Sequence, residues 1–90
     1  MKPKTEDADL SGAEFINTNL SGAQFRDVSL SAATFEDVNL NGAVFEDVAL
    51  SGVKIRNANC AGLSIEHARY EGMTIDGVSV EELLWVYRNR

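Results

Sequence analysis

Residues 40–48 read Leu40-Asn41-Gly42-Ala43-Val44-Phe45-Glu46-Asp47-Val48, two five-residue units in tandem. The same spacing continues through most of the 90-residue chain without a slip in register. An apolar and mostly large residue stands at every fifth position: Leu10, Phe15, Leu20, Phe25, Leu30, Phe35, Leu40, Phe45, Leu50, Ile55, Cys60, Ile65, Tyr70, Ile75 and Val80. A small or medium residue, mostly apolar, stands two positions before each: Ala8, Ala13, Thr18, Ala23, Val28, Ala33, Val38, Ala43, Val48, Val53, Ala58, Leu63, Ala68, Met73 and Val78.

A period of five fits neither an α-helix nor a flat strand. In a helix, at about 100° per residue, the large residues would spiral around the axis, and in a strand they would alternate between the two faces. A chain that turns by about a quarter circle after each unit directs all of them to one central axis. Such fixed-period similarity is typical of repeat architectures. Four units would then form one coil, in which equivalent positions recur every twenty residues.

Two units carry a recognisable motif. Ala8-Asp9-Leu10-Ser11-Gly12 and, with one substitution, Ala58-Asn59-Cys60-Ala61-Gly62 resemble the pentapeptide-repeat motif Ala-(Asp/Asn)-Leu-x-x. The resemblance covers about residues 5–80. It implies an all-β solenoid, a right-handed quadrilateral parallel β-helix of nearly four coils. The departures from the motif, which predict looser or wider last coils, are Cys60, Leu63, Tyr70 and Met73.

The repeat pattern divides the chain into three segments. Residues 1–7 are a polar N-terminal segment, residues 8–79 form the β-helix, and residues 80–90 form a capping helix. Within the β-helix, leucine units alternate with phenylalanine units. Glycine or alanine stands two positions after each leucine, and asparagine or aspartate stands two positions after each phenylalanine. Both classes favour tight turns, so we expect two alternating kinds of corner.

Equivalent residues of successive coils should lie on top of one another. Aromatic rings stacked in this way pack in offset geometry. The expected stacks are the ring pairs Phe15–Phe35 and Phe25–Phe45, the ion pairs Arg26–Glu46 and Glu36–Arg56, and the amides of Asn19, Asn39 and Asn59, bonded from coil to coil.

The repeat pattern changes at Ser79. Ser79-Val80-Glu81-Glu82 reads as a capping box, which predicts a helix over residues 80–88. Its apolar face, which should close the last coil, comprises Val80, Leu83, Leu84 and Tyr87. Trp85 and Val86 fall on a second apolar strip.

Charge and composition limit the function classes. The net charge of −6 argues against direct binding to nucleic acid or to anionic membranes. One cysteine excludes an internal disulfide. Neither a signal peptide nor an apolar run long enough for a membrane helix is visible, so a cytoplasmic bacterial location is expected.

No residue pattern indicates catalysis. Cys60 occupies an inward position as a small core residue, and His67 lies at an outward corner. The acidic pairs Glu36-Asp37 and Glu46-Asp47 would stand on a convex surface without a cleft, where carboxylates are solvated. A phosphate-binding loop and a Cys/His metal cluster are both missing from the sequence. We therefore expect no enzyme activity, no cofactor and no metal.

The sequence favours a non-catalytic protein-interaction or structural module. The candidate interface residues are Trp85, Val86 and Tyr87, and the acidic pairs are a second candidate. The partner would be another protein, a second copy bound through the C-terminal helix, or copies stacked end to end through the N-terminal coil. The alternative is an acidic DNA mimic that regulates DNA gyrase, because the resemblance implies that some members protect gyrase from quinolones in this way. A solenoid of about 18 Å would match only about five base pairs.

Overall fold

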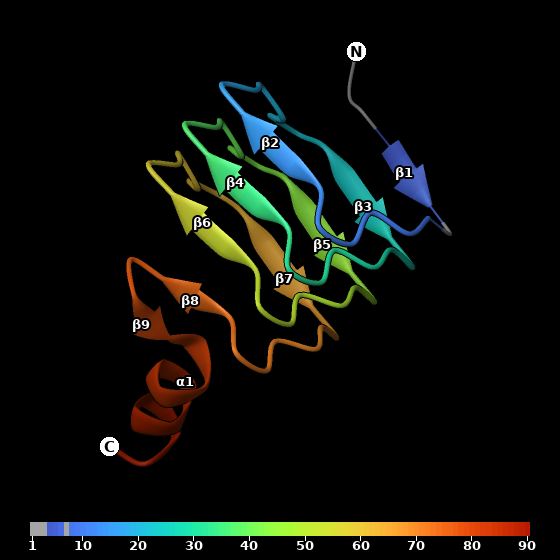
Figure 1. Cartoon of the computed structure of the whole chain (residues 1–90). Helices are drawn as coiled ribbons and strands as arrows, with labels where there is room; N and C mark the ends of the chain where they lie inside the picture. The colour runs from blue at the N-terminus through green and yellow to red at the C-terminus, as the bar shows by residue number, and fades with distance from the viewer. Residues whose placement is uncertain (1–3, 7) are drawn as a thin grey trace.

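The computed structural model describes residues 4–6 and 8–90, with side chains from residue 8 onward. Its elements are short strands followed by one helix (Figure 1). The strands are β1 (Lys4–Glu6), β2 (Glu14–Ile16), β3 (Gln24–Arg26), β4 (Thr34–Glu36), β5 (Val44–Glu46), β6 (Lys54–Arg56), β7 (Ser64–Glu66), β8 (Thr74–Ile75) and β9 (Val78–Ser79), and the helix is α1 (Val80–Arg88).

The strands form two sheets that make two sides of a solenoid, and their ladders are parallel apart from the pair β8–β9. One sheet has the order β1-β3-β5-β7, and the other has the order β2-β4-β6-β8-β9. Partners in the parallel ladders are twenty residues apart, as in Phe25↔Phe45. Isolated bridges build the other two sides with the same offset, Asn19↔Asn39↔Asn59 on one and Asp9↔Ser29↔Ala49↔Arg69 on the other. The predicted parallel solenoid is therefore confirmed, with about three turns.

The core follows the predicted inward positions. The buried residues run from Leu20 to Ile55 without a break in the pattern, and Met73 joins them. The rings of Phe25 and Phe45 stack with centroids 4.8 Å apart and planes 4° apart, and Phe15 and Phe35 stack at the same distance. Rings on the two sheets meet edge to face, as Phe35 and Phe45 do at 6.2 Å. Both predicted ring stacks are thus confirmed.

Inward volumes compensate from turn to turn. Alanine stands two positions before Phe25, Phe35 and Phe45. Where isoleucine replaces phenylalanine, the smaller position grows: the pairs become Val53/Ile55, Leu63/Ile65 and Met73/Ile75. Met73 is fully buried, but Leu63 is half-buried and Ile65 and Ile75 are 37% and 40% exposed. The last turns are therefore less buried than the central ones, although their smaller inward position holds larger residues.

Two polar stacks differ from the sequence expectation. The amide oxygens of Asn19, Asn39 and Asn59 accept hydrogen bonds within their own coil, from backbone N–H groups two residues later, at 2.9–3.1 Å. These local turns replace the expected side-chain bonds between coils. Arg26 Nε lies 3.7 Å from Glu46 Oε1, but Glu36 and Arg56, although register partners, form no ion pair.

The two predicted kinds of corner are both left-handed turns. Glycines such as Gly42 (φ 71°) occupy one kind, and polar residues such as Asp47 (φ 53°) occupy the other. Ala32 stands at a glycine-type corner with φ 62°. A left-handed conformation costs an L-residue about 1–2 kcal/mol.

Replacing Ala32 by glycine should therefore stabilise the solenoid. Relief of the backbone strain outweighs the extra flexibility of glycine in the unfolded chain, and we expect a net gain of about 0.5–1 kcal/mol. Urea denaturation followed by circular dichroism measures the change. The reverse substitution, Gly42→Ala, is the matched control and should destabilise the solenoid. The added Cβ would meet no atom within 4 Å, so the loss would come from the left-handed backbone conformation alone. A loss of stability in Ala32→Gly would contradict this account.

The solenoid ends in a hairpin that the sequence analysis counts as one more corner. Asp76 and Gly77 both have positive φ, at 49° and 79°, and form a two-residue turn between β8 and β9. Asp-Gly favours this type of hairpin turn. β9 therefore runs antiparallel to β8, and Val78, expected to point inward, is exposed. The reversal ends the parallel ladder at β8, and the structure has about three turns where the sequence predicts nearly four.

Helix α1 starts where the capping motif predicts. Ser79 Oγ accepts a hydrogen bond from the Glu82 N–H at 3.2 Å. Glu81 accepts one from the Gly72 N–H at 3.2 Å, which ties the helix to the last turn. Val80 packs against the core and Leu84 lines a hollow with Tyr70 and Met73, whereas Leu83 and Tyr87 are exposed. Two of the four residues expected to close the last coil, Leu83 and Tyr87, therefore do not do so, because only a narrow face of the helix is turned toward the coil.

Candidate interaction surface

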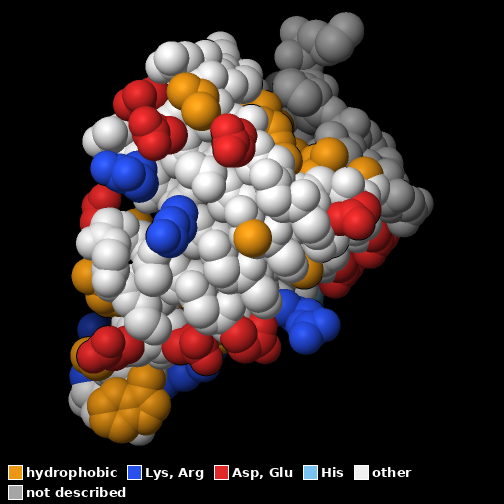
Figure 2. All heavy atoms as spheres, viewed as in Figure 1, with side chains coloured by type: hydrophobic (Ala, Val, Ile, Leu, Met, Phe, Trp, Pro, Cys, Tyr) orange, Lys and Arg blue, Asp and Glu red, His pale blue; other side chains and the backbone are white. Residues whose placement is uncertain are grey.

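Exposed apolar side chains occupy more than one side of α1: Leu83, Val86 and Tyr87 lie on adjoining sides, and Trp85 lies on the side of Glu81 and Arg88. We call Leu83, Trp85, Val86 and Tyr87 the α1 patch. Trp85 is 65% exposed and Tyr87 62%, and the other two members are about half exposed. Figure 2 shows hydrophobic side chains on α1 next to a band of acidic ones. The sequence predicts Trp85, Val86 and Tyr87 as interface candidates, and the structure adds Leu83.

The α1 patch lies between charges of opposite sign. Glu81 and Glu82 occupy the first turn of α1 and Arg88 the last, each at the helix end that favours its charge. The guanidinium of Arg90 lies over the Tyr87 ring, 4.4 Å from its centroid. Such a contact stabilises an exposed aromatic ring by about 0.5–1 kcal/mol. The patch is thus an apolar centre with an acidic end and a basic end.

The two acidic pairs do not come together. Glu36 belongs to β4 in one sheet, and Glu46 belongs to β5 in the other. Asp37 and Asp47 stand at exposed left-handed corners beside them. Glu46 is paired with Arg26, which reduces the negative charge on its side of the solenoid. No cleft collects these four carboxylates, in agreement with solvated positions.

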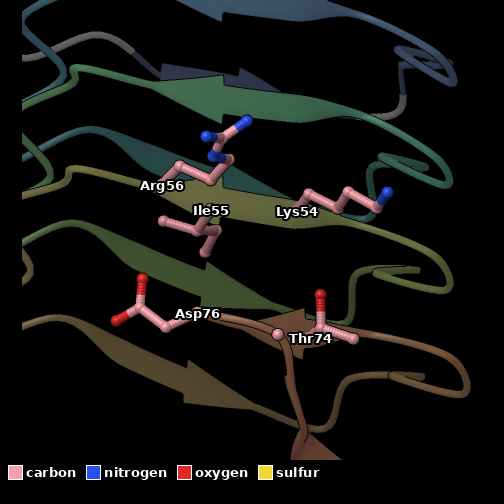
Figure 3. Close-up of a pocket in the computed structure, with 6 residues that line it drawn as sticks. Lys54, Ile55, Arg56, Thr74 and Asp76 are labelled. Carbon is pink, nitrogen blue, oxygen red and sulfur yellow. The ribbon is translucent and has the colours of Figure 1, made fainter.

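The outer surface of β6 and β8 has a shallow hollow of about 300 Å³. Lys54 and Arg56 project from β6 above it, and Thr74 and Asp76 lie below (Figure 3). The Arg56 side chain is directed away from Asp76 in this view. These polar side chains point in different directions, so they do not converge on one ligand atom in the hollow.

Cys60 is exposed, which corrects the expected core position. It follows Leu20 and Leu40 in its column, but it is shorter, and Ala58 beside it is small. A hollow of about 190 Å³ opens next to both residues. Partial burial raises the pKa of the Cys60 thiol. The thiol is therefore held in its protonated form and is not activated as a nucleophile.

The described part of the chain, residues 4–6 and 8–90, holds no cluster of His, Cys, Asp and Glu that could bind a metal ion. His67 stands at a left-handed corner with φ 54° and is exposed. Within the same residues, no helix has the length and apolar character needed to cross a bilayer.

The geometry defines a class of protein: a parallel β-solenoid built from five-residue units and ending in one helix. The sequence matches the family model for pentapeptide repeats, with eight copies, over residues 8–47 and 33–69. The chain therefore belongs to the pentapeptide-repeat family, which is usually non-catalytic. Comparison with curated proteins gave no match.

Proposed function

We propose that this pentapeptide-repeat protein is a non-catalytic interaction module and that the α1 patch is its main contact surface. The main observation that supports this proposal is the exposed apolar area on α1. A buried aromatic side chain covers about 150–250 Å², so Trp85 and Tyr87 together expose on the order of 250 Å². Leu83 and Val86 add to this exposed apolar area, and large exposed apolar surfaces often mark interaction sites.

A second copy of the chain is the partner that the charges favour. If two α1 helices pack antiparallel, the acidic first turn of each lies beside the basic last turn of the other. Trp85 and Val86, which lie on neighbouring sides of α1, then meet the partner helix at the centre of a two-fold interface, with charge pairs at its rim. A parallel arrangement would place like charges together.

Light scattering tests this proposal. We expect the full chain to have twice the 9.8 kDa mass of one chain, and Trp85→Ser to return it to one. Ile16→Ser is the matched control, because Ile16 is 49% exposed on β2, outside the α1 patch. A single-chain mass for the unmodified protein at every concentration would contradict self-association and would turn attention to the charged sides.

The acidic DNA mimic is a second proposal, supported by one arrangement. Asp27 and Asp47 repeat at successive corners of one edge, with Glu46 beside them. The Arg26–Glu46 pair and the exposed Lys54 and Arg56 interrupt the negative surface. A supercoiling assay with DNA gyrase separates the proposals, since only the mimic should inhibit at tens of micromolar.

A further inference from the structure

The sheet that contains β7 ends without a covering strand. The other sheet continues past β8 because β9 folds back onto it. β7 has β5 on one side, and on its other side no strand of residues 4–6 and 8–90 pairs with it. Figure 1 shows α1 below β8 and β9, and its residues Val80 and Leu84 line a hollow together with Ile65 of β7.

The free edge of β7 offers backbone hydrogen-bonding groups. The Ser64 N–H donates to the Ala43 carbonyl at 3.0 Å, and the Glu66 carbonyl accepts from the Asp47 N–H at 3.2 Å. Ser64 and Glu66 therefore bond toward β5. Alternate residues of a parallel strand bond to opposite sides, so the N–H and C=O of Ile65 face the open edge. Unpaired groups of this kind are a template for another strand.

An apolar groove adjoins this edge. It measures about 210 Å³, and its lining consists of Ile65, Tyr70, Met73, Ile75, Val80 and Leu84. Ligand pockets usually measure about 300–1,000 Å³, so this groove fits one or two side chains and not a cofactor. Ile65 is 37% exposed, whereas Phe45, directly above it, is 1% exposed. One further apolar residue in this column would cover Ile65.

The charges beside the groove favour basic residues next to that apolar residue on an added strand. Glu46 and Glu66 are register partners, and like charges directly opposite each other destabilise a sheet. Arg26 pairs with Glu46 on one side, but the other side of Glu66 is the open edge. A lysine or arginine on an added strand would lie beside Glu66.

We propose that the β7 edge is a docking site for an extended segment of a partner protein, in which a large apolar residue is flanked by lysine or arginine. The segment adds as a strand to β7, its apolar side chain enters the groove, and its cation lies beside Glu66. This mode of recognition takes affinity from main-chain hydrogen bonds and specificity from the pocket. The groove is lined by Val80 and Leu84 of α1 but by none of the α1 patch residues.

Nuclear magnetic resonance with ¹⁵N-labelled full chain tests the proposal. The probe is a synthetic peptide Gly-Val-Lys-Ile-Arg-Asn-Ala, the sequence of residues 52–58, because β6 carries the required Lys-Ile-Arg order within a sheet. We expect saturable shifts concentrated at Ser64, Ile65, Glu66 and Met73, and slower hydrogen exchange of the Ile65 amide. Glu66→Gln should weaken binding about threefold, as expected for one exposed charge pair.

Matched peptides separate the contributions. Exchanging the peptide isoleucine for serine should abolish the shifts, and exchanging both cations for glutamate should weaken binding more than Glu66→Gln does. Shifts spread over the acidic corners, or equal binding of the serine peptide, would overturn the proposal. So would shifts at β7 on concentration of the protein alone, since a second copy would then occupy the edge. Trp85 does not line the groove, so the Trp85→Ser variant should still bind the peptide even if it no longer self-associates. Peptide binding by this variant therefore tests the β7 edge separately from the α1 patch.

Discussion

Replacing Phe45 by alanine is expected to lower the free energy of unfolding by about 3–5 kcal/mol. Phe45 is almost completely buried in the middle of the solenoid. Its ring stacks on Phe25 at 4.8 Å and meets the edge of Phe35 at 6.2 Å. The substitution removes both ring contacts and leaves a cavity between two turns that other turns hold in place. Chemical denaturation followed by circular dichroism measures the loss.

Ile65→Ala is the control within the same column. Ile65 is the register partner of Phe45 but lies in the last turn, where no coil covers it. Its loss should cost about 1 kcal/mol, because the side chain is already partly hydrated. Since contacts in a solenoid join neighbouring turns, the contrast tests whether position along the axis sets the energy. A loss below about 1 kcal/mol for Phe45→Ala would contradict its central role in packing.

The central turns could be predicted from sequence because one requirement, that the apolar residue of every five-residue unit points to the same axis, explains every unit. A residue such as Phe35 or Leu40 repeats at a spacing that only a four-cornered coil buries. The corners followed from the same units, since Gly42 and Asp47 belong to residue types that accept left-handed backbone. Each feature was repeated several times, so that local and global preferences agree.

The C-terminal end was less predictable because its features occur once. Asp76-Gly77 fits the five-residue register and also the two-residue hairpin, and the hairpin forms. The signal was present, as Asp-Gly between short apolar runs favours a hairpin. Cys60 kept its place in the column, but its exposure depends on what lies beneath it, which the repeat does not specify.

The exposed apolar surface of α1 was predictable in part. Helical periodicity gives the direction of each α1 side chain but not the width of the contact with the last coil. Trp85 was correctly expected outside that contact, whereas Leu83 and Tyr87 were expected within it. The open edge of β7 depends on where α1 and β9 lie in space. That information comes from the structure alone.

Exchanging the two inward residues of one turn for those of the next turn tests whether their volumes are coupled in the free energy of unfolding. Ala43 and Phe45 stand where the next turn has Leu63 and Ile65. Ala43→Leu alone should cost about 1–3 kcal/mol, because Ala43 is fully buried and has no room for added methylenes. Phe45→Ile alone should cost about 1–2 kcal/mol by opening a partial cavity and ending the stack on Phe25.

The double variant should be more stable than the sum of these losses predicts, by about 1 kcal/mol or more. The added leucine should fill the space that the shorter isoleucine leaves. The control combines Ala43→Leu with Phe15→Ile, the same exchange in the first turn of the other sheet, where the two changes should add. If both double variants deviate equally from the sum of their single losses of stability, or if neither deviates, the two inward side chains of a unit do not compensate each other in volume. Coupling confined to residues 43 and 45 would show that each five-residue unit is packed as a unit, with its two inward side chains sharing one volume.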